Sequence, residues 1–259
     1  MDLGNMVRGI ASDRFAQNLL QFWEHDEGTL ELWRASSNFV YAFERNQVQY
    51  FLRISFEQDN LVEQIKAELA FMQYLQLNGF PTVIPIQSIN QKLIEMLKTP
   101  DGTYIAVVFS AANGINLNED TITEKEMEVW GNSLASLHCL SKKYEPIGDK
   151  RKSWLNTLQF MENVFKKHPG EQLALQELLE ITNWLQSLST ANDVFGLIHY
   201  DFQLDNLFFK ADKEPYFNVI DFDDAMYHWY ALDIVTALDD FIGDDNPQSK
   251  LMVQSFLNG

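Results

Sequence analysis

The sequence predicts an α+β protein with a strand-rich first part and a larger, mainly helical second part. Residues 1–109 contain several short segments with period-two alternation and turn signals, but one strong helical pattern. Residues 110–259 contain amphipathic patterns with apolar residues three and four positions apart. With 259 residues, of which 46% are hydrophobic, the chain is long enough to bury a substantial core.

The first part is expected to form a sheet of short antiparallel strands. Residues 30–44 predict two strands around a short polar turn, which consists of Ser36, Ser37 and Asn38. The dipeptide Asn46-Gln47 predicts the next turn. Residues 48–55 then alternate, so that Leu52 and Arg53 belong to opposite faces of a third strand.

A helix and a second hairpin are expected to follow these strands. Apolar residues recur at helical spacing over residues 61–78, and Gly79 and Pro81 predict where the helix ends. Two further strands are predicted near residues 92–97 and 104–109, joined by a turn at residues 99–102, Thr-Pro-Asp-Gly.

The second part is expected to begin at a small, polar linker, which contains Ser110, Ala111 and Ala112. Thr123 and Glu126 form a capping-box pattern that predicts a helix through Leu140. Residues 172–188 predict another amphipathic helix. The sequence stops directly after an apolar, helix-like stretch, and we expect a C-terminal part to be missing.

The composition restricts the partners and the compartment. The chain has 37 acidic and 19 basic residues and a formal net charge of −18. An acidic surface repels nucleic acid and anionic membranes, so neither is expected as a partner. Cys139 is the only cysteine, which excludes an internal disulfide and fits a reducing cytoplasm. The chain starts without a signal-peptide pattern, and its sequence does not indicate an oligomeric state.

Polar residues interrupt two apolar runs in the second part, at residues 196–209 and 217–224. These residues include Asp201, Asn206 and Asp221. Burial of an unpaired carboxylate or amide is costly, so we expect these groups to be matched. In phosphoryl transfer, one carboxylate accepts a hydroxyl proton, while a second carboxylate and an amide hold Mg²⁺. An isolated Asp-x-x-x-x-Asn is commonly a turn or a helix cap, but its combination with Ile-Asp-Phe favours the functional interpretation.

The segments His-Tyr-Asp-x-x-x-x-Asn and Ile-Asp-Phe resemble the catalytic and metal-binding motifs of the aminoglycoside phosphotransferase and choline kinase superfamily. The branch with homoserine-kinase-like and stress-response-kinase-like proteins is the most similar. The resemblance covers nearly the whole chain. It implies a protein-kinase-like fold with a nucleotide-binding lobe over residues 1–109 and a helical lobe over residues 110–259. It also implies transfer of the γ-phosphate of ATP to a hydroxyl group of a small molecule.

The resemblance assigns roles to residues at matching positions. Asp201 would be the catalytic base, Asn206 and Asp221 would bind Mg²⁺, and His199 would brace the loop. Arg53 lies where the family has a phosphate-binding lysine, and its ion-pair partner would be Glu68. The remaining expected nucleotide contacts are a phosphate-covering turn of Ser36, Ser37 and Asn38 and an adenine-binding hinge of Ser110, Ala111 and Ala112. Asp233 is expected to begin a helix or brace a loop.

Three departures from the family pattern leave alternatives open. Arg53 replaces lysine, so GTP is not excluded as the nucleotide. The phosphate-covering turn contains no glycine, and Tyr200 stands where glycine is usual. The acceptor could instead be a protein serine or threonine, or the chain could be a nucleotide-sensing module without turnover. The acidic pairs at residues 223–224, 239–240 and 244–245 are expected to be solvated surface or, alternatively, to line a pocket for a cationic acceptor.

Overall fold

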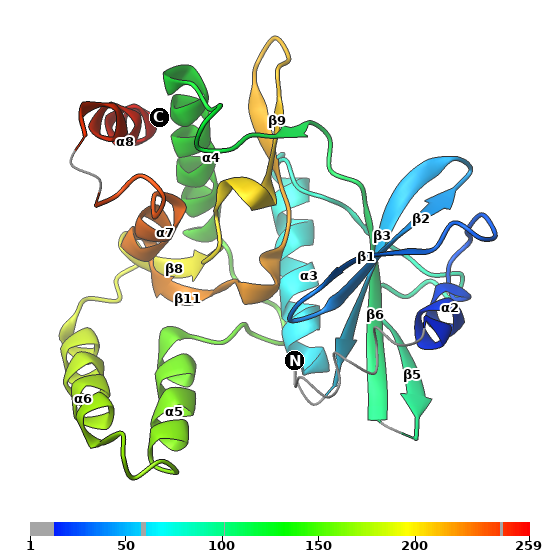
Figure 1. Cartoon of the computed structure of the whole chain (residues 1–259), viewed down its shortest axis with the longest axis horizontal. Coiled ribbons are helices and arrows are strands. Elements are labelled where there is room, and N and C mark those ends of the chain that lie inside the picture. The colour runs from blue at the N-terminus through cyan, green and yellow to red at the C-terminus, as the bar shows by residue number, and fades with distance from the viewer. Residues whose placement is uncertain (1–12, 58–60, 101, 244–245) are drawn as a thin grey trace.

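A computed structural model of the chain describes residues 13–57, 61–100, 102–243 and 246–259. Its first part is an antiparallel sheet in the order β1-β2-β3-β6-β4, and β5 also pairs with β6. The strands are β1 (Glu31–Ala35), β2 (Phe39–Arg45), β3 (Val48–Phe56), β4 (Pro85–Ile86), β5 (Glu95–Thr99) and β6 (Gly102–Ser110). Helix α3 (Val62–Leu77) lies on one face and α2 (Arg14–Leu20) on the other, as Figure 1 shows.

Strand β6 separates two hydrophobic cores. Its residues Ile105 and Val107 belong to the cluster that contains α3, whereas Ala106 and Val108 belong to the cluster around α2. Because side chains alternate along a strand, one apolar run can serve both cores. Strand β3 follows the same rule, and its Leu52 lies in the α2 cluster. The predicted alternation of β3 is confirmed, although Arg53 and Ser55 of its polar face are buried as well.

The predicted helix over residues 61–78 is confirmed as α3, and the turn at Asn46-Gln47 joins β2 to β3. The strand predicted at residues 92–97 starts later, at Glu95. Lys92 instead closes a tight loop, in which its carbonyl accepts a hydrogen bond from the Ser88 backbone. Asp101 of the predicted Thr-Pro-Asp-Gly turn lies outside the described residues. Helix α2 was not predicted from the sequence.

The second part combines helices with short antiparallel pairs. Thr123 and Glu126 make the predicted capping box of α4 (Glu124–Ser141), and the helix predicted over 172–188 is confirmed as α6 (Gln172–Ser187). Strands β10 (Tyr216–Val219), β9 (Leu207–Lys210) and β7 (Ile115–Asn116) form one sheet, and β11 (Met226–Trp229) pairs with β8 (Phe195–Ile198). The other helices are α5 (Trp154–Phe165), α7 (Tyr230–Ala237) and α8 (Pro247–Asn258), together with the short 3₁₀ helices η1 (Leu204–Asn206) and η2 (Phe222–Asp224).

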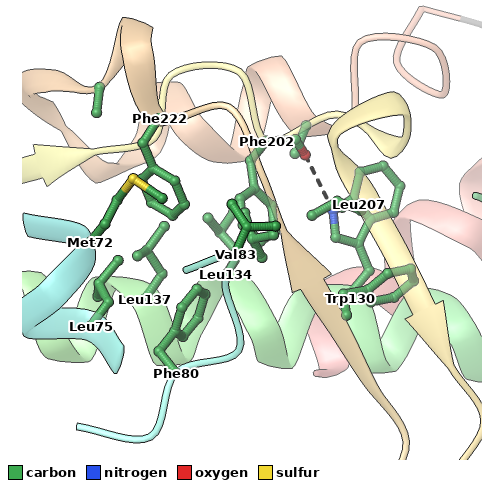
Figure 2. Close-up of a cluster of buried hydrophobic side chains, with 14 of the residues drawn as sticks. Met72, Leu75, Phe80, Val83, Trp130, Leu134, Leu137, Phe202, Leu207 and Phe222 are labelled. Atoms are coloured by element: carbon green, nitrogen blue, oxygen red, sulfur yellow. Dashed lines mark hydrogen bonds between the residues drawn. The ribbon is translucent and has the colours of Figure 1, made fainter. Parts of the chain in front are cut away.

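The core between α3 and α4 holds the loops that carry the candidate site. Figure 2 shows Met72 and Leu75 of α3 packed with Leu134 and Leu137 of α4, and with the loop residue Phe222. The two parts of the chain therefore share one hydrophobic cluster. Within the described ranges, every helix is too short or too polar to cross a bilayer.

Candidate active site

The predicted catalytic loop, residues 199–206, joins β8 to β9 and places Asp201 beside Asn206. The Asn206 amide nitrogen donates to the Asp201 carboxylate over 2.8 Å and to the Asp201 carbonyl over 3.0 Å. These bonds commit the amide nitrogen and leave the amide oxygen as the group suited to a cation. Asp201 is half-buried, so its carboxylate can reach a substrate while its orientation is fixed.

Each candidate carboxylate is followed by a phenylalanine that is completely buried, namely Phe202 after Asp201 and Phe222 after Asp221. The His199 ring packs edge-on against both, with centroid distances of 5.5 Å to Phe202 and 4.5 Å to Phe222. Its Nε2 donates to the Ile220 carbonyl over 2.9 Å. Burial lowers the pKa of His199, so the ring is neutral at pH 7. His199 therefore links the two loops as a structural brace.

Asp233 on α7 braces the catalytic loop from behind, as the sequence suggested. Its completely buried carboxylate accepts backbone hydrogen bonds from His199 over 3.0 Å and from Tyr200 over 2.6 Å. His138 Nε2 lies 2.9 Å from the same carboxylate. Tyr200 has φ = 75°, in the left-handed region that favours glycine. This backbone angle explains why glycine is usual at that position, and why tyrosine there is strained.

The predicted metal loop, residues 220–225, follows β10 and connects directly to the catalytic loop. The Ile220 amide donates to the Asn206 carbonyl over 3.0 Å, so Asn206 contacts Asp201 through its side chain and the metal loop through its backbone. Asp221 has φ = 64° and ψ = 59° at the start of η2. A non-glycine residue with this backbone is uncommon, and such strain is often found at functional sites.

The carboxyl groups of Asp221 and Asp223 are hydrogen-bonded to each other. Burial, together with the charge and hydrogen bond of Asp223, raises the pKa of Asp221 to about 8. Burial also opposes the charge of Asp223, but Arg53 and the hydrogen bond from Asp221 lower its pKa. The pair therefore shares one proton at neutral pH, and a divalent cation would fit in place of that proton.

The cation site would be completed by a ligand. Among the described residues, no group of three His, Cys, Asp or Glu side chains could enclose a metal ion. Mg²⁺ in proteins commonly takes one or two carboxylates and completes its shell with phosphates and water.

Asp223 corrects the expectation that the acidic pair at residues 223–224 is solvated surface. Its carboxylate is half-buried and accepts a 2.7 Å hydrogen bond from the Asn38 amide. The Asn38 amide oxygen in turn accepts a 2.7 Å bond from Ser55 Oγ. Asn38 and Asp223 are 185 positions apart, so no sequence spacing could have indicated this contact. Asp224 is exposed, whereas residues 244–245 lie outside the described residues.

Arg53 and Glu68 form the expected ion pair on the sheet side of the site. Two guanidinium nitrogens of Arg53 each donate to a Glu68 oxygen over 2.8 Å. Arg53 is 7% exposed and Glu68 is 1% exposed, so the pair is shielded from water. The charges of Asp223 and Asp221 also act on Arg53, which places its guanidinium beside the metal loop. A bidentate pair of this kind fixes the guanidinium plane.

The remaining residues predicted to contact the nucleotide differ in their burial and in their hydrogen bonds. Ser36 and Ser37 are exposed at the turn between β1 and β2, whereas Asn38 is buried against Asp223. At the predicted hinge, the Ser110 amide donates to the Ile84 carbonyl over 2.9 Å. Ala111 and Ala112 follow this bond and are half-buried. An adenine ring would therefore have to meet the backbone beyond the Ser110 amide.

A family model and several solved structures are similar to this chain. The model of the phosphotransferase enzyme family matches residues 29–254. A search of curated protein sequences finds no significant match. Among solved structures, amicoumacin kinase in complex with AMP-PNP, Ca²⁺ and amicoumacin has a TM-score of 0.85 at 21% identity, over 96% of this chain and 76% of that chain.

Two further structures show the same fold. A microcompartment-associated aminopropanol kinase has a TM-score of 0.73 at 23% identity, over 95% of this chain and 80% of that one. A spectinomycin phosphotransferase in complex with ADP and spectinomycin has a TM-score of 0.60 at 15% identity, over 95% of this chain and 79% of that one. The family match spans most of the sequence, and the fold is that of small-molecule kinases. The chain belongs to the phosphotransferase enzyme family.

Proposed function

We propose that the protein transfers the γ-phosphate of ATP, bound with Mg²⁺, to a hydroxyl group of a small molecule that carries an amine. The observation that carries this proposal is the position of Asn206. Its side chain holds Asp201, and its backbone carbonyl holds the metal loop next to Asp221. These contacts support a site in which a base for the acceptor hydroxyl lies close to ligands for the nucleotide's cation, as phosphoryl transfer requires.

Asp201 is the residue suited to the acceptor. The Asn206 amide donates to Asp201 Oδ2, which leaves Oδ1 to accept the hydrogen of the acceptor hydroxyl. The hydroxyl oxygen forms a bond to the γ-phosphorus, its proton passes to Asp201, and the bond to the leaving ADP oxygen breaks. Because little covalent help is needed, we expect the rate to depend mainly on positioning and fixed charge.

Asn206, through its amide oxygen, and Asp221 are the residues that would hold Mg²⁺. When bound, the ion neutralises charge on the phosphate oxygens. Arg53 lies beside these groups and uses two of its nitrogens for Glu68. A guanidinium has five N–H donors in a fixed fork, so donors remain for a phosphate oxygen.

An amine-bearing acceptor is supported by the charge near Asp201. Asp224 has an exposed surface, but part of the residue is buried. This burial, together with the charges of Asp223 and Asp201, raises the pKa of Asp224 to about 6. A positively charged group would be attracted to this excess of carboxylates. The solved structures include kinases of aminopropanol and of ethanolamine, which are amino alcohols.

The test is a transfer assay with radiolabelled ATP, and separately GTP, in the presence of Mg²⁺. The acceptors are 1-amino-2-propanol, ethanolamine, choline, homoserine, spectinomycin, an aminoglycoside, a sugar and a generic protein substrate. We expect transfer to an amine-bearing alcohol and a loss of about 10²–10⁴-fold in kcat for Asp201→Asn, since a general base contributes about this much. Nucleotide affinity should be retained in Asp201→Asn.

Asp205→Asn is the matched control, because Asp205 is an exposed carboxylate in the same loop. It should keep most of the activity. Full activity of Asp201→Asn would contradict the assignment of the base. Nucleotide binding by the wild type without transfer to any acceptor would favour the sensing module, and transfer to the protein substrate alone would favour a protein kinase.

A further inference from the structure

Arg151 lies outside the catalytic and metal loops, in the segment between α4 and α5, yet its guanidinium reaches three backbone carbonyl groups. Its Nε donates to the Ala225 carbonyl over 2.6 Å, and one terminal nitrogen donates to the Asp223 carbonyl. The other terminal nitrogen donates to the Gln64 carbonyl of α3 over 2.9 Å. One planar group therefore joins the end of η2 to the first turn of α3.

The segment that carries Arg151 is itself fixed on two sides. On one side, the Gln64 side chain donates to the Lys150 carbonyl over 3.0 Å and accepts from the Lys152 amide over 2.9 Å. On the other side, the Tyr227 amide of β11 donates to the Lys152 carbonyl over 2.9 Å. The guanidinium is thus presented from a backbone that is bound to α3 and to β11, the strand that directly follows the metal loop.

These contacts link the two ionic parts of the candidate site. Gln64 lies one helical turn before Glu68, the partner of Arg53. Asp223 and Ala225 lie two and four residues after Asp221, whose left-handed backbone must be held in place by its surroundings. Helix α3 packs against η2, as the neighbouring ribbons in Figure 1 indicate. The carbonyl groups at the end of a short helix lack hydrogen-bond donors within that helix. Arg151 supplies donors to the carbonyl groups of Asp223 and Ala225.

We propose that Arg151 is a positioning residue that fixes the metal loop, and with it Asp221, against helix α3. The proposal rests on the phosphotransferase function proposed for the chain. Lysine could keep the positive charge of Arg151, but a single ammonium group cannot reproduce a planar fork aimed at three carbonyl oxygens. The loss should therefore appear in metal affinity more than in folding.

The test measures the dissociation constant of Mn²⁺ by electron paramagnetic resonance, with saturating AMP-PNP. We expect Arg151→Lys to raise this constant about 10-fold or more, because partners behind a metal ligand commonly contribute 10–100-fold to affinity. The affinity for ADP without metal should stay within about twofold of the wild-type value, since no nucleotide contact has been removed. Arg45→Lys is the control, because Arg45 pairs with Glu24 at the surface and should leave both constants unchanged.

Two further variants separate positioning from general stability. Gln64→Ala removes the side chain that holds residues 150–152 and keeps the guanidinium, so a smaller weakening of Mn²⁺ binding is expected. It carries the test if Arg151→Lys fails to fold. In an Asp221→Asn background, Arg151→Lys should have little further effect, because contacts that act through one residue are not additive.

The outcomes distinguish this proposal from the one on which it rests. Wild-type Mn²⁺ affinity in folded Arg151→Lys and Gln64→Ala would overturn the role of Arg151 and leave the proposed function intact. Equal losses of Mn²⁺ and metal-free ADP affinity would also overturn it, since they indicate a general structural role. Failure of the wild-type protein itself to bind Mn²⁺ with AMP-PNP would reject the phosphotransferase proposal and this one together.

Discussion

At the scale of single residues, the candidate site depends on buried neighbours of the polar groups. Asp201 and Asp221 lie on loops, and each precedes a phenylalanine with no exposed surface. A buried phenylalanine contributes about 3–5 kcal/mol relative to alanine, which is enough to hold a short loop in one place. The Asp-Phe pattern in the sequence is therefore one unit, in which the second residue fixes the first.

The raised pKa of Asp221 predicts a pH dependence of stability in the metal-free protein. The unfolded carboxyl group titrates near 3.8 and the folded one near 8, so the folded state binds the extra proton between these values. The stability from this proton is fully present below the lower value and is lost as pH rises through the folded pKa. Between pH 6.5 and 8.5 we expect the free energy of unfolding to fall by about 2 kcal/mol.

Denaturant titrations across this range check the prediction, with Asp221→Asn as the comparison. The variant lacks the titrating group and should show a nearly flat profile. This window lies above the raised pKa of Asp224, which is about 6, and above the lowered pKa of His199, so neither group should dominate it. A wild-type profile as flat as that of the variant would contradict the assignment of the shared proton.

At the scale of elements, the sequence predicts where the hairpin between β2 and β3 turns. The second turn residue, however, is not the one that this turn's backbone favours. Arg45 pairs with Val48, so Asn46 and Gln47 alone form the turn, with φ of 53° and 63°. The backbone amides of both residues donate to the Asp26 carboxylate, over 3.1 and 2.9 Å. Two consecutive residues with positive φ are typical of a type I′ turn, for which Asn-Gly is the preferred sequence.

Gln47→Gly should therefore stabilise the protein. Glycine removes the steric cost of a left-handed residue, at some cost in unfolded-state entropy, for a net gain of about 0.5–1 kcal/mol. The midpoint of thermal unfolding should therefore rise, by a few degrees at most. Gln49→Gly, at an exposed position in the adjoining strand, should instead destabilise the protein by a similar amount. If both substitutions changed the free energy of unfolding in the same direction, this explanation would be contradicted.

At the scale of the whole molecule, the strand-rich and helical parts are tied together by one core and by polar contacts. The cluster that contains Leu75 of α3 also contains Leu137 of α4. Thr82 Oγ1 donates to the Val219 carbonyl over 2.8 Å, and Asn38 reaches Asp223. If either part unfolded, the apolar side chains that the other part contributes to this core would become exposed to water.

We therefore expect one cooperative unfolding transition. The calorimetric enthalpy should equal the van't Hoff enthalpy, and fluorescence and circular dichroism should report the same midpoint. Leu137→Ala should lower the stability by about 2–5 kcal/mol and shift the whole transition, because it opens a cavity in the shared core. Two separate transitions, of which Leu137→Ala shifted only one, would show that the two parts fold independently.

The sequence by itself determined the order of the two parts and the helices α3, α4 and α6, and it predicted Asp201, Asn206 and Asp221 as the residues of the candidate site. These features are written locally, in alternation, capping patterns and short spacings, so one sequence is enough to predict them. The Arg53–Glu68 pair was also predicted, because it follows from a resemblance in which both positions are fixed.

Only the tertiary structure decided which charges the site buries and what holds them. The sequence predicts a solvated acidic pair at Asp223, and Arg151 lies in a basic stretch without a motif. Their partners, Asn38 for Asp223 and Gln64 for Arg151, lie far away in the chain. Such contacts depend on how two lobes meet around a common core, and the local pattern of residues carries no record of that arrangement.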